Sequence, residues 1–475
     1  MPSLTGLVNS RQDSQGQEFA PEFERLQHAD APSSAPERVL GAKRTLVEFL
    51  CVAGPKIAAG AGQLLANLLL IRRLGPEHAG VLFVCITAII LSDAVLGSSL
   101  DIAVLKLATS REGRELSSTL RIQKAALMGK VLSCILLAVP ILVFSQAISE
   151  RLFHQFSDVR LLILALTGLL GLLILRSVQA YFQISRRFRL YGMTDLLHSL
   201  AKYGGIGILL AVGVKLPLKY LVVYACGPLL LGIVLLLTLI RPVVVAPFSW
   251  ATLTELWWSF RWYLGSGAAA SINTRMDVLL LSAAAGAAQA GLFSAAQVIC
   301  MPIQLIGMYL AVVFAPRIMP LWEQGRLSHI YHRFQFWTIA GAVVIQGLAI
   351  LLVGRLSALI LPPAYRSTTA IILLLLPSAL TALINFPWSV SLLMFAHPRF
   401  LLVFELTALP VLGLLYRVMC NWQGAIGAAT VTSGFAIVKT IVYQLLASRT
   451  AKTKPAPRQQ MTLVYGDTAT ADSSA

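Results

Sequence analysis

Long apolar runs alternate with short polar breaks from residue 45 to residue 446. Each run is long enough to cross the roughly 30 Å apolar core of a bilayer as one helix of about twenty residues. The pattern predicts about twelve transmembrane helices, at 45–71, 80–107, 125–148, 160–183, 190–213, 217–240, 258–284, 290–314, 336–361, 368–396, 400–419 and 424–446. The predicted fold class is therefore an all-α membrane protein.

The two ends of the chain are polar and predict disordered tails at 1–43 and 447–475. An even number of spans places both tails on one side of the membrane. Thirteen Lys and Arg residues fall in loops on that side and eight on the other. Because short cytoplasmic loops are enriched in Lys and Arg, both termini are expected in the cytoplasm. The longest loop, 241–257, is expected to link two halves there.

An internal repeat relates these halves. "LLLIRRLGPEHAGVLF" (68–83) aligns with "LLLSAAAGAAQAGLFS" (279–294) at an offset of 211 residues, and Gly75 and Gly80 fall on Gly286 and Gly291. Each half holds an even number of spans, so both have the same orientation. The sequence predicts two parallel six-helix lobes, 44–240 and 258–446, around a central cavity.

Composition supports a membrane protein and excludes other classes. Hydrophobic residues make up 57% of the chain and charged residues 12%, against roughly 25% charged in soluble domains. The net charge of +17 is explained by basic cytoplasmic loops, so no nucleic acid is expected as a partner. The six cysteines form no metal-binding pattern, and no catalytic or nucleotide-binding motif is present. We expect no cofactor, no metal and no enzymatic activity.

Charged residues inside the spans are candidates for function, because burial in the bilayer is costly and usually reserved for cavities. The substrate-binding candidates are the basic residues Lys56, Arg176, Lys202 and Arg275. The candidates for a coupling ion or charge pair are Asp93, Asp195, His198 and Asp277.

Each candidate also has a structural alternative. Lys56 and Asp93 lie at similar depth and could form an ion pair between adjacent helices, and Arg176 could extend towards the membrane surface. The Asp195, His198 and Lys202 stripe could be a helix contact. Arg275 and Asp277 are two residues apart, so they cannot share a helix face. A further set near span ends is expected to reach the membrane surface: Lys106, Lys130, Glu405 and Lys439.

The break at 70–84, "LIRRLGPEHAGVLFV", is predicted to be a hairpin between the first two spans. Gly75 and Pro76 turn the chain, and Gly80 allows close packing. Arg72 and Arg73 have no counterpart in the repeat and fall on the outer side, where they could meet lipid headgroups or an exiting glycan.

The hairpin resembles the L-G-P-E-x-x-G motif of one family, matched by Leu74, Gly75, Pro76, Glu77 and Gly80. That family is the polysaccharide-transport, or O-antigen flippase, branch of the multidrug/oligosaccharidyl-lipid/polysaccharide (MOP) exporter superfamily. "GLFSAA" (291–296) and "APRIMP" (315–320) resemble further family patterns, and the resemblance covers about residues 44–446.

This resemblance implies a flippase for undecaprenyl-diphosphate-linked oligosaccharide in the bacterial cytoplasmic membrane. Its partners would be that lipid-linked oligosaccharide, the bilayer, and a polysaccharide polymerase and glycosyltransferases of the same pathway. One alternative is a cation-coupled multidrug antiporter of the same superfamily, which would favour acidic cavity residues. The other is a membrane polysaccharide polymerase or ligase, which usually carries a large external loop that this chain lacks.

Overall fold

The structure is a computed structural model that describes residues 35–109, 116–154, 157–185, 187–323, 327–395 and 398–452. The regular elements in these ranges are all helical, which confirms the predicted all-α membrane fold. The N-terminal half contains α3 (Ala35–Asp93), the π-helix η1 (Ala94–Ser98), α4 (Ser99–Thr109), α5 (Leu116–Val143), α6 (Ser145–Phe153), α7 (Val159–Ile184), α8 (Phe188–Ala211), α9 (Pro217–Thr238) and α10 (Arg241–Val245). The C-terminal half contains α11 (Trp250–Glu323), α12 (Leu327–Ile360), the short 3₁₀ helix η4 (Pro363–Tyr365), α13 (Thr368–Phe395), α14 (Pro398–Gln423) and α15 (Ala425–Lys452).

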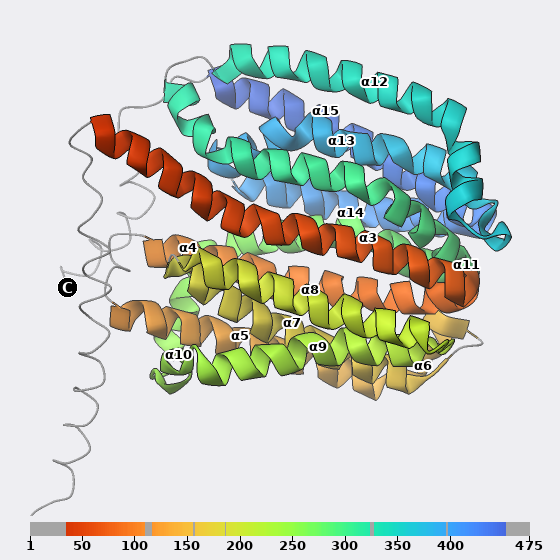
Figure 1. Ribbon diagram of the computed structural model, residues 1–475, viewed down its shortest axis with the longest axis horizontal. Helices are drawn as coiled ribbons and strands as arrows, with labels where there is room; N and C mark the ends of the chain where they lie inside the picture. The colour runs from red at the N-terminus through yellow and green to blue at the C-terminus, as the bar shows by residue number, and fades with distance from the viewer. Residues whose placement is uncertain are drawn as a thin grey trace, which may run out of the picture.

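Two of these helices, α3 and α11, reverse direction at a glycine. Gly75 has φ 73° and ψ 170°, and Gly286 has φ 85° and ψ 169°. This region of backbone space is essentially confined to glycine, because a Cβ would clash with the neighbouring peptide. Figure 1 shows that both reversals lie at the same end of the bundle. The turn predicted at Gly75 and its repeat at Gly286 are therefore both present, with nearly the same torsions.

The two hairpins cross through a second pair of glycines. A Cβ placed on Gly80 would lie 1.8 Å from the Ala287 carbonyl oxygen, and one on Gly291 would lie 1.9 Å from the Pro76 carbonyl oxygen. The repeat offset of 211 residues places Gly80 on Gly291 and Pro76 on Ala287, so the two contacts are symmetric counterparts. The second arms of α3 and α11 thus pack backbone against backbone around a local twofold axis, which only glycine permits.

Nine helical stretches in the described residues have the length and apolar composition of a membrane span. Two of them, Gly54–Leu105 and Arg261–Gly307, contain the reversals and therefore cross twice. At about 1.5 Å per residue, either stretch would otherwise be more than twice the thickness of a bilayer core. Helix α8 is more polar than these nine and lies against α3 and α9. With α8 included, the helices correspond to the twelve predicted spans.

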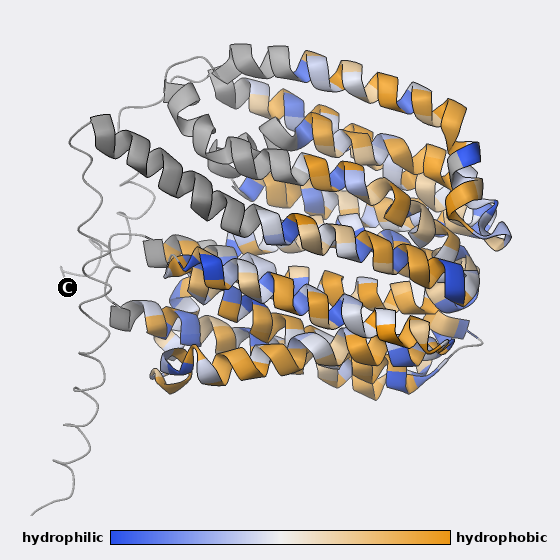
Figure 2. Cartoon of the chain, in the orientation of Figure 1, coloured by the Kyte–Doolittle hydropathy of each residue, from blue (hydrophilic) through white to orange (hydrophobic). Residues whose placement is uncertain are grey.

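Much of the apolar surface faces outwards. The segment Gln335–Arg355 of α12 is strongly apolar, yet only 11% of its most apolar 18 residues are buried within the protein. Figure 2 shows apolar residues along most of the outer surface of α9 and α12. Lipid tails are the natural solvent for such a surface, whereas a soluble protein rarely exposes so large an apolar area.

The ends of the described chain lie together. The start of α3 and the end of α15 are both at the left-hand end of the bundle in Figure 1, opposite the two glycine reversals. The short turn at Gly424 between α14 and α15 and the turn at Gly213 after α8 both use positive φ. The prediction of disordered tails is wrong at 35–43 and 447–452, which belong to α3 and α15, and the remainder of both tails lies outside the described residues.

Candidate functional site

Asp93 ends the second arm of α3, directly before the π-helix η1, and is 5% exposed. Its Oδ2 lies 3.8 Å from the Arg176 Nε on α7. Its Oδ1 is buried without a hydrogen-bond partner and abuts Gly97, where a Cβ would lie 2.8 Å from that oxygen. Single π-turns occur frequently at functional sites. A proton or a cation at this oxygen would lower the cost of burying it.

Arg176 connects Asp93 to α8 through a glutamine. The Arg176 side chain is 47% exposed, and its Nη1 donates to Gln179 Oε1 at 3.3 Å. Gln179 Nε2 in turn donates to Asp195 Oδ1 at 3.2 Å. The sequence analysis missed Gln179, although its position one turn after Arg176 on the same helix face was a usable signal. The chain of contacts from Asp93 to Asp195 joins three helices.

Lys202 lies deeper on α8 and is 7% exposed. Its Nζ is 4.5 Å from the ring centroid of Tyr203 and 4.7 Å from that of Tyr224. Within the part of the chain that the structure describes, no carboxylate lies within 4.0 Å of this ammonium. His198, one turn earlier, has a buried Nδ1 without a hydrogen-bond partner. The predicted stripe on α8 is thus turned inwards, with its lysine held by aromatic faces.

Lys56, on the first arm of α3, contacts a different aromatic residue of α8. It is half-buried and lies 5.1 Å from the ring centroid of Tyr191 on α8. The pairing of Lys56 with Asp93 that equal depth allowed is wrong, since Asp93 pairs with Arg176 instead. Depth along a helix did not determine the pair, because the direction in which each side chain faces depends on its neighbouring helices.

Arg275 and Asp277 fall on different sides of α11, as their spacing predicted. Asp277 is 1% exposed. Its Oδ2 accepts from Gln297 Nε2 on the second arm of α11 at 2.9 Å, and its Oδ1 accepts from the Val278 amide at 2.8 Å. Arg275 is exposed. Asp277 is therefore part of the interior of the C-terminal half, whereas Arg275 is accessible.

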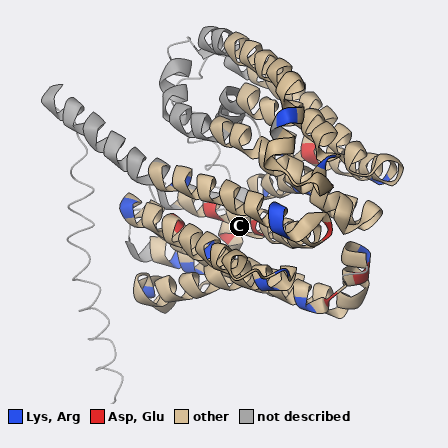
Figure 3. Ribbon diagram, turned by 45° about the vertical axis from the view of Figure 1, so that its right-hand side comes forward, with Lys and Arg blue, Asp and Glu red and all other residues tan. Residues whose placement is uncertain are grey.

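Tyr224 on α9 joins the two halves electrostatically. It packs on the Lys202 ammonium and is also close enough to Arg275 to interact with its charge. Asp93 and Arg176 act on the same tyrosine. Figure 3 shows that positions with charged residues occur along the helices as well as at the ends of the bundle. Lys202 contacts the Tyr224 ring directly, whereas the charge of Arg275, from the other half, acts on it without a direct contact.

Comparison with known proteins identifies the fold. No protein-family model and no curated protein matches the sequence. Among solved structures, the lipid II flippase MurJ in an inward closed conformation is 13% identical, with a TM-score of 0.67 over 84% of this chain and 87% of that one. A multidrug resistance MATE family transporter of the MOP superfamily, inward-facing, is 14% identical, with a TM-score of 0.57 over 84% and 96%. A MOP superfamily transporter from Pyrococcus furiosus is 13% identical, with a TM-score of 0.54 over 86% and 96%.

The chain has the fold of the MOP superfamily transporters. At these low identities the likeness shows the fold alone and transfers no substrate. No residue role is transferred either, so the charged group around Tyr224 is described from this chain's own contacts.

Arg72 of the first hairpin, which we expected to meet lipid headgroups or a glycan, instead contacts another helix of the protein. Arg72 Nε donates to the Ile360 carbonyl at 2.8 Å and its Nη2 donates to the Leu359 carbonyl at 3.1 Å. These carbonyls end α12, so Arg72 caps that helix and binds the negative end of its dipole. Arg73 is exposed and acts electrostatically on Tyr220 at the start of α9. Arg72 therefore ties the first hairpin to the C-terminal half.

The sequence analysis also missed a buried polar group in the C-terminal half. Glu405 on α14 is 1% exposed and pairs with Lys439 Nζ at 2.6 Å. Its Oε1 accepts from the Tyr443 hydroxyl at 2.8 Å and its Oε2 from Asn273 Nδ2 at 2.7 Å. The expectation that Glu405 and Lys439 reach the membrane surface is wrong for this reason. The spacing of Lys439 and Tyr443, one turn apart on α15, was the signal available.

Lys130 is a second correction of the same kind. Its side chain is fully buried and forms an ion pair with Asp101 on α4. Its Nζ also lies 3.0 Å from the Ser177 Oγ on α7. The expectation that Lys130 extends to the membrane surface is therefore wrong. Asp101 and Ser177 compensate for the cost of burying its ammonium, which would be high without partners. The side chain of Lys106 lies outside the described residues.

Proposed function

We propose that this chain is a flippase that moves undecaprenyl-diphosphate-linked oligosaccharide across the bacterial cytoplasmic membrane. The observation that carries the proposal is the buried ammonium of Lys202, which lies against the Tyr203 and Tyr224 rings with no carboxylate within 4.0 Å in the described part of the chain, while Arg275 of the other half is exposed. The shared fold with a lipid II flippase and with MOP transporters supports a transport function.

The chemistry of the substrate suits this site. A diphosphate needs cationic donors, and both the ammonium of Lys202 and the guanidinium of Arg275 can supply charge-assisted hydrogen bonds. Lys202 has no carboxylate to neutralise it in the described part of the chain. An anion beside this amine would favour its charged form, and burial strengthens the attraction between the two. The sugars would need a polar path between the halves while the lipid tail stays in the bilayer.

Transport would follow from relative movement of two six-helix lobes, 44–240 and 258–446, by alternating access. We place both termini in the cytoplasm, in accordance with the positive-inside trend. The pathway partners would be glycosyltransferases that build the lipid-linked oligosaccharide and a polymerase that consumes it.

A cation-coupled multidrug antiporter is the second candidate. The unpartnered Oδ1 of Asp93 favours it, because a buried carboxylate is suited to a proton or a monovalent cation. The MATE transporter shares the fold with a TM-score of 0.57, close to the 0.54 of the MOP superfamily transporter from Pyrococcus furiosus. This candidate predicts drug resistance without any change in surface glycan.

Replacing Lys202 or Arg275 by alanine is expected to reduce surface polysaccharide about tenfold or more in cells that lack the native gene. The reason is the loss of a charge-assisted hydrogen bond to the diphosphate, roughly 1.5–3 kcal/mol. Lys219→Ala and Arg417→Ala are matched controls, because each removes an exposed basic residue. Surface glycan is measured together with the amount of protein in the membrane. Full complementation by both test variants would contradict the proposal, and drug resistance alone would favour the antiporter.

A further inference from the structure

Two arginines and a tryptophan form a cluster at the end of the bundle opposite the glycine reversals. The Arg261 guanidinium carbon on α11 lies 4.6 Å from the Trp258 ring centroid and 5.3 Å from that of Trp262. The Arg399 guanidinium carbon on α14 lies 5.0 Å from the same Trp262 ring. One indole ring thus carries two guanidinium groups from two helices, and we refer to Arg261 and Arg399 as the interfacial arginine pair.

The helices that carry the pair are packed closely. A Cβ on Gly265, one turn after Arg261, would lie 3.1 Å from the Leu402 side chain, one turn after Arg399. The contact fixes the separation of α11 and α14 next to the cluster. The interfacial arginine pair is therefore held on a rigid part of the fold rather than on a loop.

Neither arginine is neutralised within the residues that the structure covers. No carboxylate lies within 4.0 Å of Arg261 or Arg399. Arg261 donates from Nη1 to the Trp258 carbonyl at 3.0 Å, in its own helix. A guanidinium has five donors, so most of the donors of the pair remain free for an anion. Contact of a guanidinium group with an indole ring uses its charge and does not require its N–H donors for hydrogen bonds.

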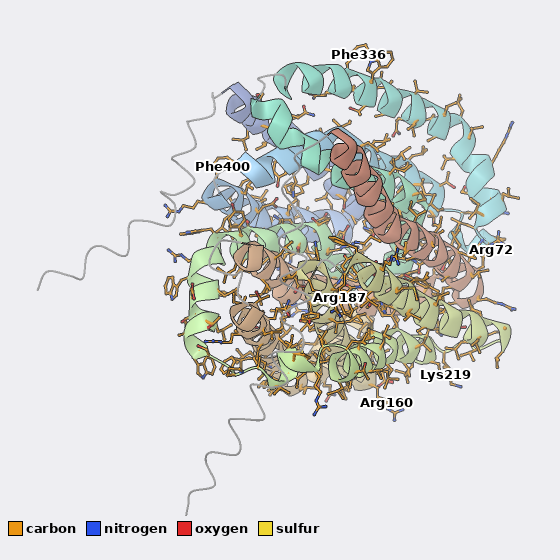
Figure 4. All side chains as sticks on the ribbon, turned by 60° about the vertical axis from the view of Figure 1, so that its left-hand side comes forward. Arg72, Arg160, Arg187, Lys219, Phe336 and Phe400 are labelled. Atoms are coloured by element: carbon orange, nitrogen blue, oxygen red, sulfur yellow. The ribbon has the colours of Figure 1, made fainter. Side chains whose placement is uncertain are left out.

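The pair lies at the expected depth of lipid phosphates. The apolar runs that predict spans at 258–284 and 400–419 begin within three residues of these arginines. Trp257, Trp258 and Phe400 beside them are 57%, 62% and 45% exposed, as expected of aromatic residues at the boundary between lipid and water. Figure 4 shows Phe400 at the end of the bundle away from Arg72.

We propose that the interfacial arginine pair, seated on Trp262, binds the phosphate of an anionic phospholipid. The pair is positively charged, lies at the start of two spans and has exposed aromatic rings beside it. These features define a site for a lipid headgroup, and the acyl chains of the bound lipid would lie along α11 and α14. The guanidinium carbons lie 5.3 and 5.0 Å from the centroid of the Trp262 ring, so both groups border the same indole. The site does not depend on which solute the chain transports.

Native mass spectrometry of the full-length protein with added phosphatidylglycerol tests this site. Arg261→Gln/Arg399→Gln is expected to weaken the tightest phosphatidylglycerol binding about tenfold, because it removes two charge-assisted donors. The matched control Arg366→Gln/Arg417→Gln removes two exposed arginines at the opposite end and is expected to bind as the wild type does. If the double variant is not monodisperse, Arg399→Gln alone is expected to show a smaller loss in the same direction.

Three results would overturn the proposal. The first is equal binding by wild type and Arg261→Gln/Arg399→Gln, and the second is an equal loss in the control pair. The third is binding of undecaprenyl diphosphate at these arginines with no preference for phosphatidylglycerol over phosphatidylcholine, which would assign the pair to the transported lipid.

Discussion

Gly80→Ala is expected to destabilise the protein by roughly 1–3 kcal/mol, as overpacking of a tight contact does. The new methyl group would lie 1.8 Å from the Ala287 carbonyl oxygen, so the two hairpins must move apart. The thermal unfolding midpoint in one detergent measures the effect. Gly204→Ala is the matched control, because it makes the same substitution in a helix where nothing lies within 4 Å of the new atom, and it should have little effect or a small stabilising one.

The reciprocal geometry makes a stronger prediction for the double variant. Gly291→Ala alone should cost about as much as Gly80→Ala, since its contact with Pro76 is the symmetric counterpart. Once the hairpins have moved apart for one methyl group, the second methyl group meets less resistance. Gly80→Ala/Gly291→Ala should therefore cost clearly less than the two single effects added together. Strict additivity would contradict the shared crossing.

Lys439→Met is expected to destabilise the protein by roughly 3–5 kcal/mol, the usual cost of leaving a buried charge unpaired. Glu405 is 1% exposed and would lose its only ion-pair partner in the described part of the chain. The unfolding midpoint again measures the loss. Lys219→Met is the control, because Lys219 is exposed at the end of the bundle and should be nearly neutral.

Removing the negative charge as well should reverse most of this loss. Glu405→Gln/Lys439→Met leaves a neutral amide that can still hydrogen-bond with Asn273 and Tyr443. The double variant should therefore be more stable than Lys439→Met alone. A double variant that is less stable than Lys439→Met would show that the carboxylate has another countercharge.

The sequence predicted the features that local chemistry determines. Gly75 and Gly286 were found because a tight reversal needs glycine and because the repeat shows it twice. Arg275 and Asp277 were separated correctly, since two residues along a helix point to different sides. The apolar runs likewise predicted the spans, because bilayer thickness fixes their length.

The features that depend on packing between distant segments were missed. Lys130, Glu405 and Lys439 were assigned to the membrane surface because their partners lie on other helices, and distance from a span end contains no information about those partners. Asp93 was matched to Lys56 because the two lie at similar depth. Its partner in the structure is Arg176, because α7 packs against α3 and presents Arg176 to Asp93. Arg72 looked like a surface charge until the end of α12 was seen beside it.

The proposed role of Lys202 and Arg275 is to bind the diphosphate of a lipid-linked oligosaccharide as it crosses the membrane. Purified protein in sealed liposomes tests it most directly, with a fluorescent oligosaccharide linked to undecaprenyl diphosphate and a quencher added outside. The account predicts that wild-type protein moves the labelled lipid between leaflets far faster than protein-free liposomes do. It also predicts that Lys202→Ala/Arg275→Ala moves it at nearly the protein-free rate, while Lys219→Ala/Arg417→Ala retains the wild-type rate. Wild-type transport by Lys202→Ala/Arg275→Ala would contradict the account.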